Sequence, residues 1–238
     1  MNRIECLQFL ARRQRARSYL EIGVKNGDAF FAVPIRRKIG VDSVRLRFRE
    51  RLRAARTYPL NSFSRIFVET SDEFFERRGE RVLGRRGVDL GFVDGKHTYP
   101  QALRDITNAL RYLSPRGLIV VHDTNPGTAA EAWPGDSPTE VSRANPSGWN
   151  GIWCGDVWKA IIDLRSTTDV GIRTLPDEFG VTVVNPRIKG EKLGDDLADL
   201  DVVRFEDLDR NRERWLLLCT PNELEGWLEL DPALTSRP

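Results

Sequence analysis

Short apolar runs alternate with longer amphipathic stretches from residue 18 to about residue 184. This alternation is typical of β-α-β units, in which helices connect the parallel strands of one sheet. Strands are predicted at residues 19–24, 39–41, 65–69, 88–93 and 118–121. Two later runs, 170–175 and 179–184, are separated only by Pro176-Asp177-Glu178 and predict a hairpin. The pattern therefore predicts an α/β fold.

Explicit start signals mark helices between these strands. Thr98 and Gln101 have the spacing of a capping box, and apolar side chains then recur at helical spacing. Thr70 and Glu73 repeat the capping-box spacing after the third predicted strand. Asp156 is a candidate cap for a later helix.

The stretch from residue 44 to residue 56 fits two patterns. Its arginines alternate with other residues, which favours a strand with one basic face, whereas Val44, Phe48, Leu52 and Ala55 recur as they would on a helix. We prefer the helix. Its arginine-rich side is a solvated face in the simpler interpretation and a phosphate-binding patch in the other.

The composition changes after the fifth predicted strand. Residues 125–154 are rich in proline and glycine and contain Trp133, Trp149 and Trp153. A loop of this length is usually functional or disordered, and its tryptophans favour a lid or substrate wall over a loop that merely packs on the core. We therefore expect a core domain over residues 1–187 with an insertion at about 125–155, followed by a charged, partly helical extension over 188–238.

Composition narrows the class of protein. The chain has 238 residues, of which 40% are hydrophobic, and a formal net charge of +2. The apolar content excludes a disordered chain, and near-neutral charge disfavours a dedicated nucleic-acid coat. Three scattered cysteines indicate reduced thiols rather than a disulfide framework. No stretch resembles a membrane span or a signal peptide, so a cytoplasmic protein is expected.

The ends of the predicted strands carry the candidate chemistry, because ligands of open α/β sheets bind beyond the carboxyl ends of the strands. The first strand ends in a turn that contains Gly23 and Gly27, where the backbone can approach a ligand closely. Asp42 follows at the end of the next strand, where a carboxylate can accept both hydroxyls of a ribose. The spacing fits a cofactor that contains adenosine. The glycine pattern of NAD-binding proteins and the phosphate loop are both absent.

The only two histidines, His97 and His122, stand near Asp94 and Asp123 at the ends of the fourth and fifth predicted strands. Two independent placements of this kind predict a shared site. Converging carboxylates repel each other unless a cation or a proton intervenes, so Asp94 and Asp123 could hold Mg²⁺ or a similar ion.

These residues carry a resemblance to a known family. The ordered segments EIGVKNG, VDSV, ETSDEFF, FVDGKHTYPQALRDI and LSPRGLIVVHDT resemble the class I S-adenosylmethionine-dependent methyltransferases. They are most similar to the small-molecule O-methyltransferase branch that reads D-G-x-H-x-Y and then H-D at successive strand ends. The resemblance covers residues 18–184. It implies a doubly wound, Rossmann-like, mostly parallel seven-stranded sheet with an antiparallel last strand, and S-adenosylmethionine as the cofactor.

The resemblance also implies roles for individual residues. Cofactor-binding residues would be Glu21, Gly23 and Gly27 at the methionine and ribose, Asp42 at the ribose hydroxyls, Ser71 and Asp72 at the adenine, and Asp94 at the methyl-transfer site. Metal-dependent relatives use an aspartate that matches Asp94 and two adjacent residues at the end of the fifth strand. Here these are either His122 with Asp123 or Asp123 with Thr124. His97 is the candidate catalytic base, with Lys96 in reserve.

The function expected from this resemblance is methylation of a hydroxyl group on a small molecule of sugar or natural-product type, with or without a divalent metal. One alternative is an RNA methyltransferase that uses the arginines between Arg36 and Arg56. The other is a cofactor-binding module of the same fold without catalysis. Neither a membrane nor a nucleic acid is the expected partner, and homo-oligomerisation is left open.

Overall fold

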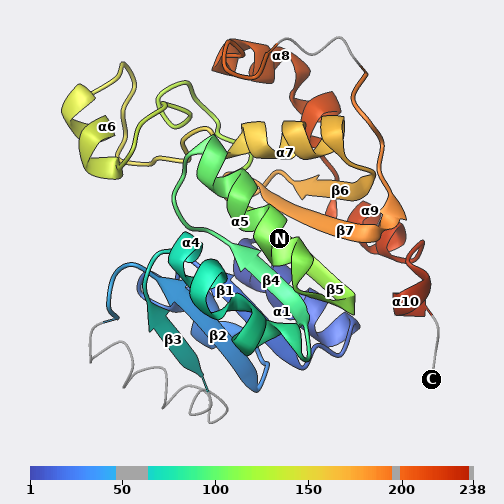
Figure 1. Ribbon diagram of the computed structural model, residues 1–238. Coiled ribbons are helices and arrows are strands. Elements are labelled where there is room, and N and C mark those ends of the chain that lie inside the picture. The colour runs from blue at the N-terminus through green and yellow to red at the C-terminus, as the bar shows by residue number, and fades with distance from the viewer. Residues whose placement is uncertain (47–63, 195–198, 236–238) are drawn as a thin grey trace. The chain divides into compact units, whose positions relative to one another are not determined.

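The computed structural model describes residues 1–46, 64–194 and 199–235. Seven strands form one sheet in the order β3-β2-β1-β4-β5-β7-β6 (Figure 1). Their bounds are Ser18–Ile22 for β1, Arg37–Asp42 for β2, Arg65–Val68 for β3, Val88–Val93 for β4, Leu113–His122 for β5, Val170–Leu175 for β6 and Val181–Lys189 for β7. This strand order, with helices between the strands, is the Rossmann-like arrangement that the sequence predicted.

The contacts between Cα atoms divide the chain into two compact units. The first contains the described residues of 1–95 and 105–120, and the second contains those of 96–104 and 121–235. Helix α5 (Tyr99–Arg111) and strand β5 therefore contribute residues to both units. The described part of 188–235 belongs to the same unit as residues 121–187.

In the first unit, parallel pairing brings the carboxyl ends of the strands to one edge. Ile22, the last residue of β1, pairs with Val41 of β2 on one side and with Val93 of β4 on the other. Strands β1 and β4 are buried along almost their whole length because both faces are covered. Besides the later part of α5, the described residues of this unit include the helices α1 (Arg3–Arg13), α2 (Asp28–Ala32) and α4 (Ser71–Phe74) and the π-helix η2 (Phe75–Gly84).

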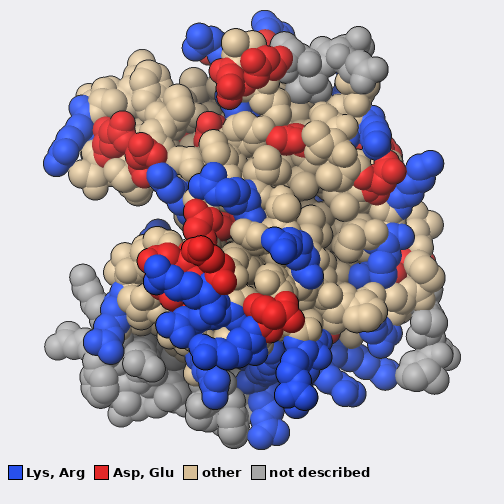
Figure 2. Space-filling view, viewed as in Figure 1, with Lys and Arg blue, Asp and Glu red and all other residues tan. Residues whose placement is uncertain are grey.

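Charge in the first unit is segregated along the strands. Arginines stand at or just before the amino ends, with Arg17 before β1, Arg36 before β2 and Arg65 at the start of β3. Carboxylates stand at the carboxyl ends instead, such as Asp42 after β2 and Asp94 after β4. Figure 2 shows Lys and Arg side chains crowded over the part of the molecule in which Figure 1 draws β1 to β4. Although the net charge of the chain is near neutral, positive and negative side chains are therefore separated along the strands of the first unit.

In the second unit, β6 and β7 form the predicted hairpin and pair antiparallel from Leu175↔Val181 to Gly171↔Asn185. Its other helices are α6 (Pro138–Ala144), α7 (Val157–Thr167), α8 (Phe205–Leu216), α9 (Pro221–Leu228) and α10 (Pro232–Thr235). Helix α6 lies within the predicted insertion. Helices α8 and α9 give residues 205–228 the helical character that the sequence indicated for the extension.

Two local predictions are wrong. The helix expected from Val44 onward is not present at residues 44–46, where the backbone is irregular and Leu46, not Val44, is buried. The rest of that prediction, and most of the stretch between Arg36 and Arg56 assigned to RNA binding, lies outside the described residues. Strand β5 begins at Leu113, five residues earlier than expected, because Pro115 and Gly117 are part of the strand rather than a turn before it.

Two simpler expectations can also be compared with the fold. All three cysteines are buried and none forms a disulfide within the described part of the chain. Within the described ranges, no helix combines the length and the apolar character that crossing a bilayer requires.

Candidate functional site

In the first unit, the turn after β1 and the end of β4 are in direct contact. Gly23 has a left-handed backbone with φ of +87°, and a Cβ atom there would come within 1.9 Å of the carbonyl oxygen of Asp94. The N–H of Gly23 donates to the carbonyl of Val41, and the N–H of Asp94 donates to the carbonyl of Ile22, both at 2.9 Å. Only glycine fits this position, so the predicted cofactor residues Gly23 and Asp94 lie together.

Asp42 faces the same glycine turn. One of its carboxylate oxygens accepts the N–H of Lys25 at 2.6 Å, and the other accepts the N–H of Val44 at 2.7 Å. Each carboxylate oxygen keeps a second lone pair that could accept a ribose hydroxyl. Gly27, at φ +84°, begins α2 at the end of the turn. The turn, Asp42 and Asp94 thus form one edge of the first unit.

Glu21 is a buried acid beneath this edge. Only 1% of its surface is exposed, and Tyr19 donates its hydroxyl hydrogen to the Glu21 carboxylate at 2.5 Å. Burial raises the pKa of Glu21 well above its usual value, and the nearby Asp94 adds to that rise, while the hydrogen bond from Tyr19 opposes it. A carboxyl group with a raised pKa can donate as well as accept a hydrogen bond.

Ser71 and Asp72 begin α4, directly after β3. Thr70 caps this helix in the predicted capping box with Glu73, because each side chain takes the other's backbone N–H. Asp72 is exposed and Ser71 is half-buried. Both residues therefore stand at the carboxyl end of a parallel strand, where the adenine role was predicted.

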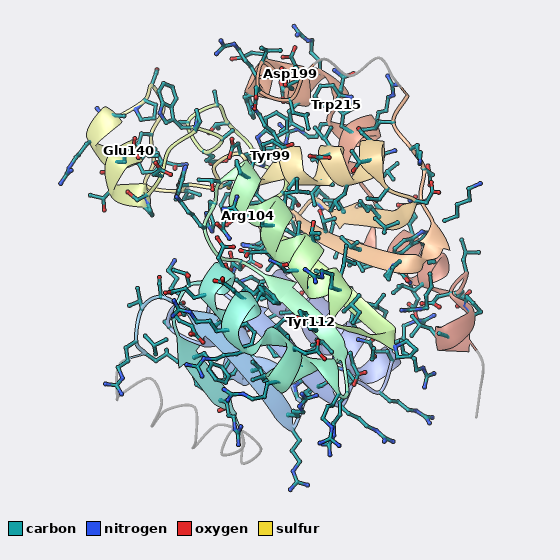
Figure 3. The ribbon with its side chains drawn as sticks, in the orientation of Figure 1. Tyr99, Arg104, Tyr112, Glu140, Asp199 and Trp215 are labelled. Atoms are coloured by element: carbon teal, nitrogen blue, oxygen red, sulfur yellow. The ribbon has the colours of Figure 1, made fainter. Side chains whose placement is uncertain are left out.

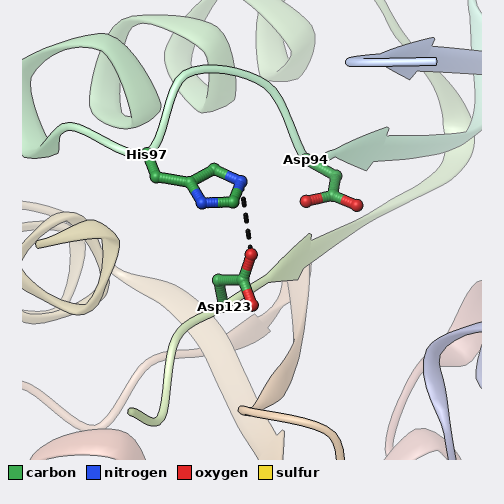
Figure 4. A group of neighbouring side chains, drawn as sticks. All are labelled: Asp94, His97 and Asp123. Carbon is green, nitrogen blue, oxygen red and sulfur yellow. Dashed lines mark ion pairs between the residues drawn. The ribbon is translucent and has the colours of Figure 1, made fainter. Parts of the chain in front are cut away.

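In the second unit, His97 and Asp123 lie against each other (Figure 4). His97 Nε2 is 3.2 Å from Asp123 Oδ2, although the two residues are 26 positions apart in the sequence. Asp123 is buried and has a left-handed backbone with φ of +58°, a conformation that non-glycine residues adopt mostly at functional or strained positions. Of the residues expected to share a site, His97 and Asp123 are thus in direct side-chain contact.

The insertion fixes the orientation of the His97 ring. Its Nδ1 is 2.8 Å from the backbone carbonyl oxygen of Trp153, and the two rings are 5.3 Å apart. A carbonyl can only accept, so Nδ1 must carry the hydrogen. In the neutral imidazole, Nε2 is then the basic nitrogen, and it faces a carboxylate. Two acceptors that converge in this way share a proton or a cation.

His122 also contacts Asp123, with its Nδ1 3.3 Å from Asp123 Oδ1. Asp123 therefore stands between the only two histidines of the chain. The hydroxyl of Thr124, in contrast, accepts a hydrogen bond from Thr182, which in turn is bonded to Thr174. Of the two residue pairs considered as metal ligands, this geometry favours His122 with Asp123. The third residue of that predicted set, Asp94, belongs to the first unit, and the complete set stays a prediction.

Glu131 organises the segment that holds His97, and the sequence analysis missed it. Its buried carboxylate accepts the N–H of Gly127 at 2.8 Å and the side-chain amide of Asn150 at 3.1 Å. Its backbone carbonyl accepts the N–H groups of Cys154 and Gly155. A Cβ atom on Gly155 would lie 1.9 Å from the His97 carbonyl oxygen. The insertion thus forms a hydrogen-bonded wall beside His97.

The start of α5 is tied to the same wall. Asp156 Oδ1 accepts the N–H of Tyr99 at 2.6 Å, and Tyr99 donates its hydroxyl hydrogen to Asp163 on α7 at 2.5 Å. Figure 3 shows Tyr99 at the first turn of α5. Asp156 is the N-cap residue of α7, as expected, but its carboxylate accepts the N–H of Tyr99 on α5 rather than one of α7. Burial raises the pKa of Tyr99 and, against opposing hydrogen bonds, that of Asp156.

A family model described as a methyltransferase domain matches residues 20–124. The match begins in β1 and ends after β5, so every predicted site residue from Glu21 to Thr124 lies within it. No curated protein matches the chain closely enough to count as a relative.

Solved structures share the fold over most of the chain. A putative O-methyltransferase from Klebsiella pneumoniae is 16% identical, with a TM-score of 0.55, and the match covers 78% of this chain and 80% of that one. The O-methyltransferase TomG from Streptomyces achromogenes, in complex with S-adenosylmethionine, is 18% identical, with a TM-score of 0.52 and 79% of each chain covered. The methyltransferase PaMTH1 from Podospora anserina, bound to S-adenosylhomocysteine, is 18% identical, with a TM-score of 0.52 and 76% of each chain covered. At these identities the likeness establishes the fold.

The strand order, the glycine turn beside Asp94 and the hairpin that supplies the antiparallel strands define the Rossmann-like fold of class I methyltransferases. The match to a methyltransferase domain covers 105 of the chain's 238 residues, all of them within this fold.

Proposed function

We propose that this protein methylates a hydroxyl group of a small molecule, with S-adenosylmethionine as methyl donor and His97 as the catalytic base. The observation that carries the proposal is the orientation of His97. The Trp153 carbonyl accepts the hydrogen of Nδ1, so Nε2, on the side of Asp123, is the ring nitrogen that takes the proton. A base is required by an alcohol or phenol acceptor, which must lose its proton as the methyl group is transferred.

The cofactor is assigned to the edge of the first unit. Gly23 lets the backbone turn tightly against Asp94, and Asp42 has lone pairs to accept the ribose hydroxyls. Glu21, Gly27, Ser71 and Asp72 complete the proposed cofactor set. TomG and PaMTH1, which share the fold, hold S-adenosylmethionine and S-adenosylhomocysteine, and this supports the assignment.

In the proposed reaction, the methyl group and the hydroxyl proton are transferred in one step. The acceptor oxygen forms a bond to the methyl carbon as the bond between that carbon and the cofactor sulfur breaks, and the hydroxyl proton passes to His97 Nε2. The products are the methyl ether and S-adenosylhomocysteine. The imidazolium that results is stabilised by the Asp123 carboxylate 3.2 Å away. The proton then leaves His97 to solvent, which restores the base.

We also infer that Asp123 and His122 bind a divalent cation, for which the resemblance implies Asp94 as a third ligand. Asp123 presents an oxygen to each histidine, and His122 is buried at 6% exposure. When bound, such a cation would lower the pKa of the acceptor hydroxyl. An imidazole among the donors departs from the all-oxygen set that Mg²⁺ prefers and suits Mn²⁺, Zn²⁺ or Fe²⁺ better. In the absence of metal, His97 supplies the base by itself.

The acceptor is proposed to be small because the charges argue against RNA. In the first unit, Arg17, Arg36 and Arg65 stand at or before the amino ends of strands, whereas the proposed cofactor edge carries carboxylates. Phosphates would be attracted to the first edge and repelled by the second. Natural-product hydroxyls are the proposed acceptors, as for TomG, which is involved in tomaymycin synthesis.

A thermal-shift screen tests the proposal directly. The protein is melted with S-adenosylhomocysteine, NAD⁺ or ATP, each with and without Mg²⁺ or Mn²⁺. A ligand at about 100 times its Kd adds ~2.7 kcal/mol to the free energy of unfolding, which shifts the melting temperature measurably. We expect a shift with S-adenosylhomocysteine alone. Transfer of a radiolabelled methyl group to a panel of hydroxylated small molecules then separates an enzyme from a non-catalytic binding module.

A further inference from the structure

We infer that a pocket in the second unit binds the methyl acceptor and that this acceptor carries a sugar ring without acidic groups. The inference rests on the proposed function and names its substrate class. The pocket has a volume of about 430 Å³ and is formed by the start of the insertion, the turn between β6 and β7, and helix α8. Pockets for small molecules typically measure roughly 300–1,000 Å³.

Two residues in the wall of the pocket belong to the segments that carry or orient the proposed catalytic residues. Asn125, in its wall, follows Asp123 by two positions. Glu131, in the same wall, holds the N–H groups of Cys154 and Gly155 through its carbonyl, next to the residue whose carbonyl orients His97. A ligand in the pocket therefore lies against the two segments that position the proposed base and its carboxylate partner.

Arg212 on α8 fixes the polar lining. Its Nη1 donates to the side-chain oxygen of Asn125 at 2.5 Å and to the carbonyl of Pro126 at 2.7 Å, and its Nη2 donates to Asp209 at 3.0 Å. Its guanidinium also lies over the ring of Phe205, 5.7 Å from the centroid. Lining groups held in this way keep their orientation before a ligand arrives, so binding costs less conformational entropy. Helix α8, which lies beyond the matched methyltransferase domain, thus holds the polar groups of the pocket in position.

Phe179 is presented to the pocket by a strained backbone. Phe179 and the preceding Glu178 both adopt left-handed conformations, with φ of +66° and +52°. This conformation is unfavourable for residues with a Cβ atom, which comes close to the following carbonyl oxygen. The carbonyl of Phe179 accepts the N–H of Asn125 at 2.6 Å, which holds the turn in place. Strain of this kind persists where the surrounding structure enforces it, commonly at ligand sites.

The lining chemistry selects among acceptor classes. Two carboxylates, Glu131 and Asp209, stand against one guanidinium, Arg212, so the formal charge is −1. An anionic acceptor such as a nucleotide is therefore disfavoured. A planar phenol would be best held by an apolar slot, but here carboxylate and amide groups surround a single aromatic ring. A sugar fits this lining, because its hydroxyls can form hydrogen bonds with the polar groups while its ring C–H groups pack on Phe179.

Binding is tested on the full chain saturated with S-adenosylhomocysteine. The probes are a panel of methyl hexopyranosides and methyl 6-deoxyhexopyranosides, with catechol and caffeic acid as the phenolic arm. Saturation-transfer NMR reports which probes bind, and radiolabelled S-adenosylmethionine reports which are methylated. We expect glycosides to bind through their ring C–H groups and to be methylated in preference to both phenols.

Variants locate the binding to this pocket. Phe179→Ala and Asp209→Asn are expected to weaken glycoside binding at least fivefold, with S-adenosylhomocysteine affinity unchanged. Glu206→Gln, an exposed position on the same helix outside the lining, is the matched control and should match the wild type. Phe179→Leu is the conservative variant: it keeps an apolar side chain at the turn, so it shows whether the effect of Phe179→Ala comes from misfolding of the turn.

The inference is overturned if glycosides neither bind nor react, or if both pocket variants bind them as the wild type does. Phenol methylation without glycoside methylation overturns it and leaves the proposed function intact. Failure to bind S-adenosylhomocysteine refutes the proposed function itself.

Discussion

His97 Nδ1 lies 2.8 Å from the backbone carbonyl oxygen of Trp153. A backbone carbonyl does not titrate and cannot donate, so this contact assigns the ring hydrogen to Nδ1 whenever the imidazole is neutral. It leaves Nε2 as the base and directs it at Asp123, 3.2 Å away. The insertion therefore determines which ring nitrogen of His97 is basic. This dependence can be tested by replacing His97 itself and by replacing Gly155 in the insertion.

Replacement of His97 should abolish turnover and spare cofactor binding. A positioned general base contributes roughly 10²–10⁴-fold to rate, so His97→Gln should lower kcat by at least a hundredfold. Radiolabelled methyl transfer measures kcat, and calorimetry measures the affinity for S-adenosylhomocysteine. Lys96→Ala tests the reserve candidate for the base: because Lys96 is exposed and paired with Asp136 at 2.7 Å, its replacement should leave kcat unchanged. An unchanged kcat in His97→Gln would remove His97 from the mechanism.

The contact between Gly155 and His97 should matter more than the left-handed backbone at Gly155. An added Cβ would lie 1.9 Å from the His97 carbonyl, whereas at Gly148, with φ of +82°, it would meet nothing within 4 Å. Alanine at either position costs roughly 1–2 kcal/mol of backbone strain. Gly155→Ala should also displace His97 and lower kcat at least tenfold, while Gly148→Ala should keep its activity. Equal kcat values in the two variants would contradict this account.

The proposed metal role predicts a specific pattern of loss and recovery. If Asp123, His122 and Asp94 share a cation, EDTA should lower turnover at least tenfold, and Mn²⁺ should restore it better than Mg²⁺ because one donor is an imidazole. Asp123→Asn should lose the response to Mn²⁺, and His122→Asn should shift the preference toward Mg²⁺. Turnover that is indifferent to EDTA and to added metal would leave His97 as the sole activating group.

Buried Lys38 should make stability rise with pH in the alkaline range. Lys38 is 1% exposed, donates to the carbonyl of Phe30 at 2.8 Å, and has its pKa lowered by burial to about 8, partly opposed by Glu21. Between pH 8 and the unfolded-state value near 10.5, the unfolded chain binds more protons than the folded one, so the free energy of unfolding increases with pH. The full increase is roughly 3 kcal/mol.

Lys38→Met isolates this contribution. Urea unfolding of both proteins at pH 7, 9 and 10.5 should show a rise with pH in the wild type that is smaller or absent in the variant. The variant should also be the more stable of the two at pH 7, where the cost of the buried charge is complete. Parallel pH curves for the two proteins would show that Lys38 does not carry the effect.

The sequence was sufficient to predict the relationships that follow from strand order. Parallel strands end at one edge, so Gly23, Asp42 and Asp94 were expected to come together, and the alternation of apolar runs located their strands to within a few residues. The capping box at Thr70 formed as its spacing indicated. The spacing of Asn2 and Glu5 carried the same signal for α1 and was missed.

Other features depend on which segments meet in space. The Trp153 carbonyl has no signature in the sequence, because every residue has a carbonyl. Asp156 precedes α7 and was therefore assigned to it, but its carboxylate reaches the N–H of Tyr99 on another helix. Glu131 is one acid among many until the insertion folds around it. The cofactor edge was thus predictable from local pattern, whereas the wall around His97 was not.

Arg165 should be the residue that holds the C-terminal extension in place. It lies in α7, is buried, and donates to the carbonyls of Glu191, Arg214 and Trp215. The last two belong to the final turn of α8, where unpaired carbonyls carry partial negative charge. Burial lowers the pKa of Arg165 to about 10, which leaves the guanidinium charged at neutral pH.

Removal of this guanidinium leaves several buried carbonyls without a donor, so Arg165→Met should lower the free energy of unfolding by at least ~3 kcal/mol. Arg165→Lys should recover less than half of the loss, because an ammonium cannot form the planar fork that contacts two chain segments at once. Arg143→Met, at an exposed position on α6, is the control and should change stability little. Urea unfolding measures all three, and stability of Arg165→Met equal to that of the control would show that α8 is held by its apolar contacts alone.

The same variant should affect the acceptor. Since α8 lines the proposed acceptor pocket, Arg165→Met should raise KM for the acceptor more than it lowers kcat.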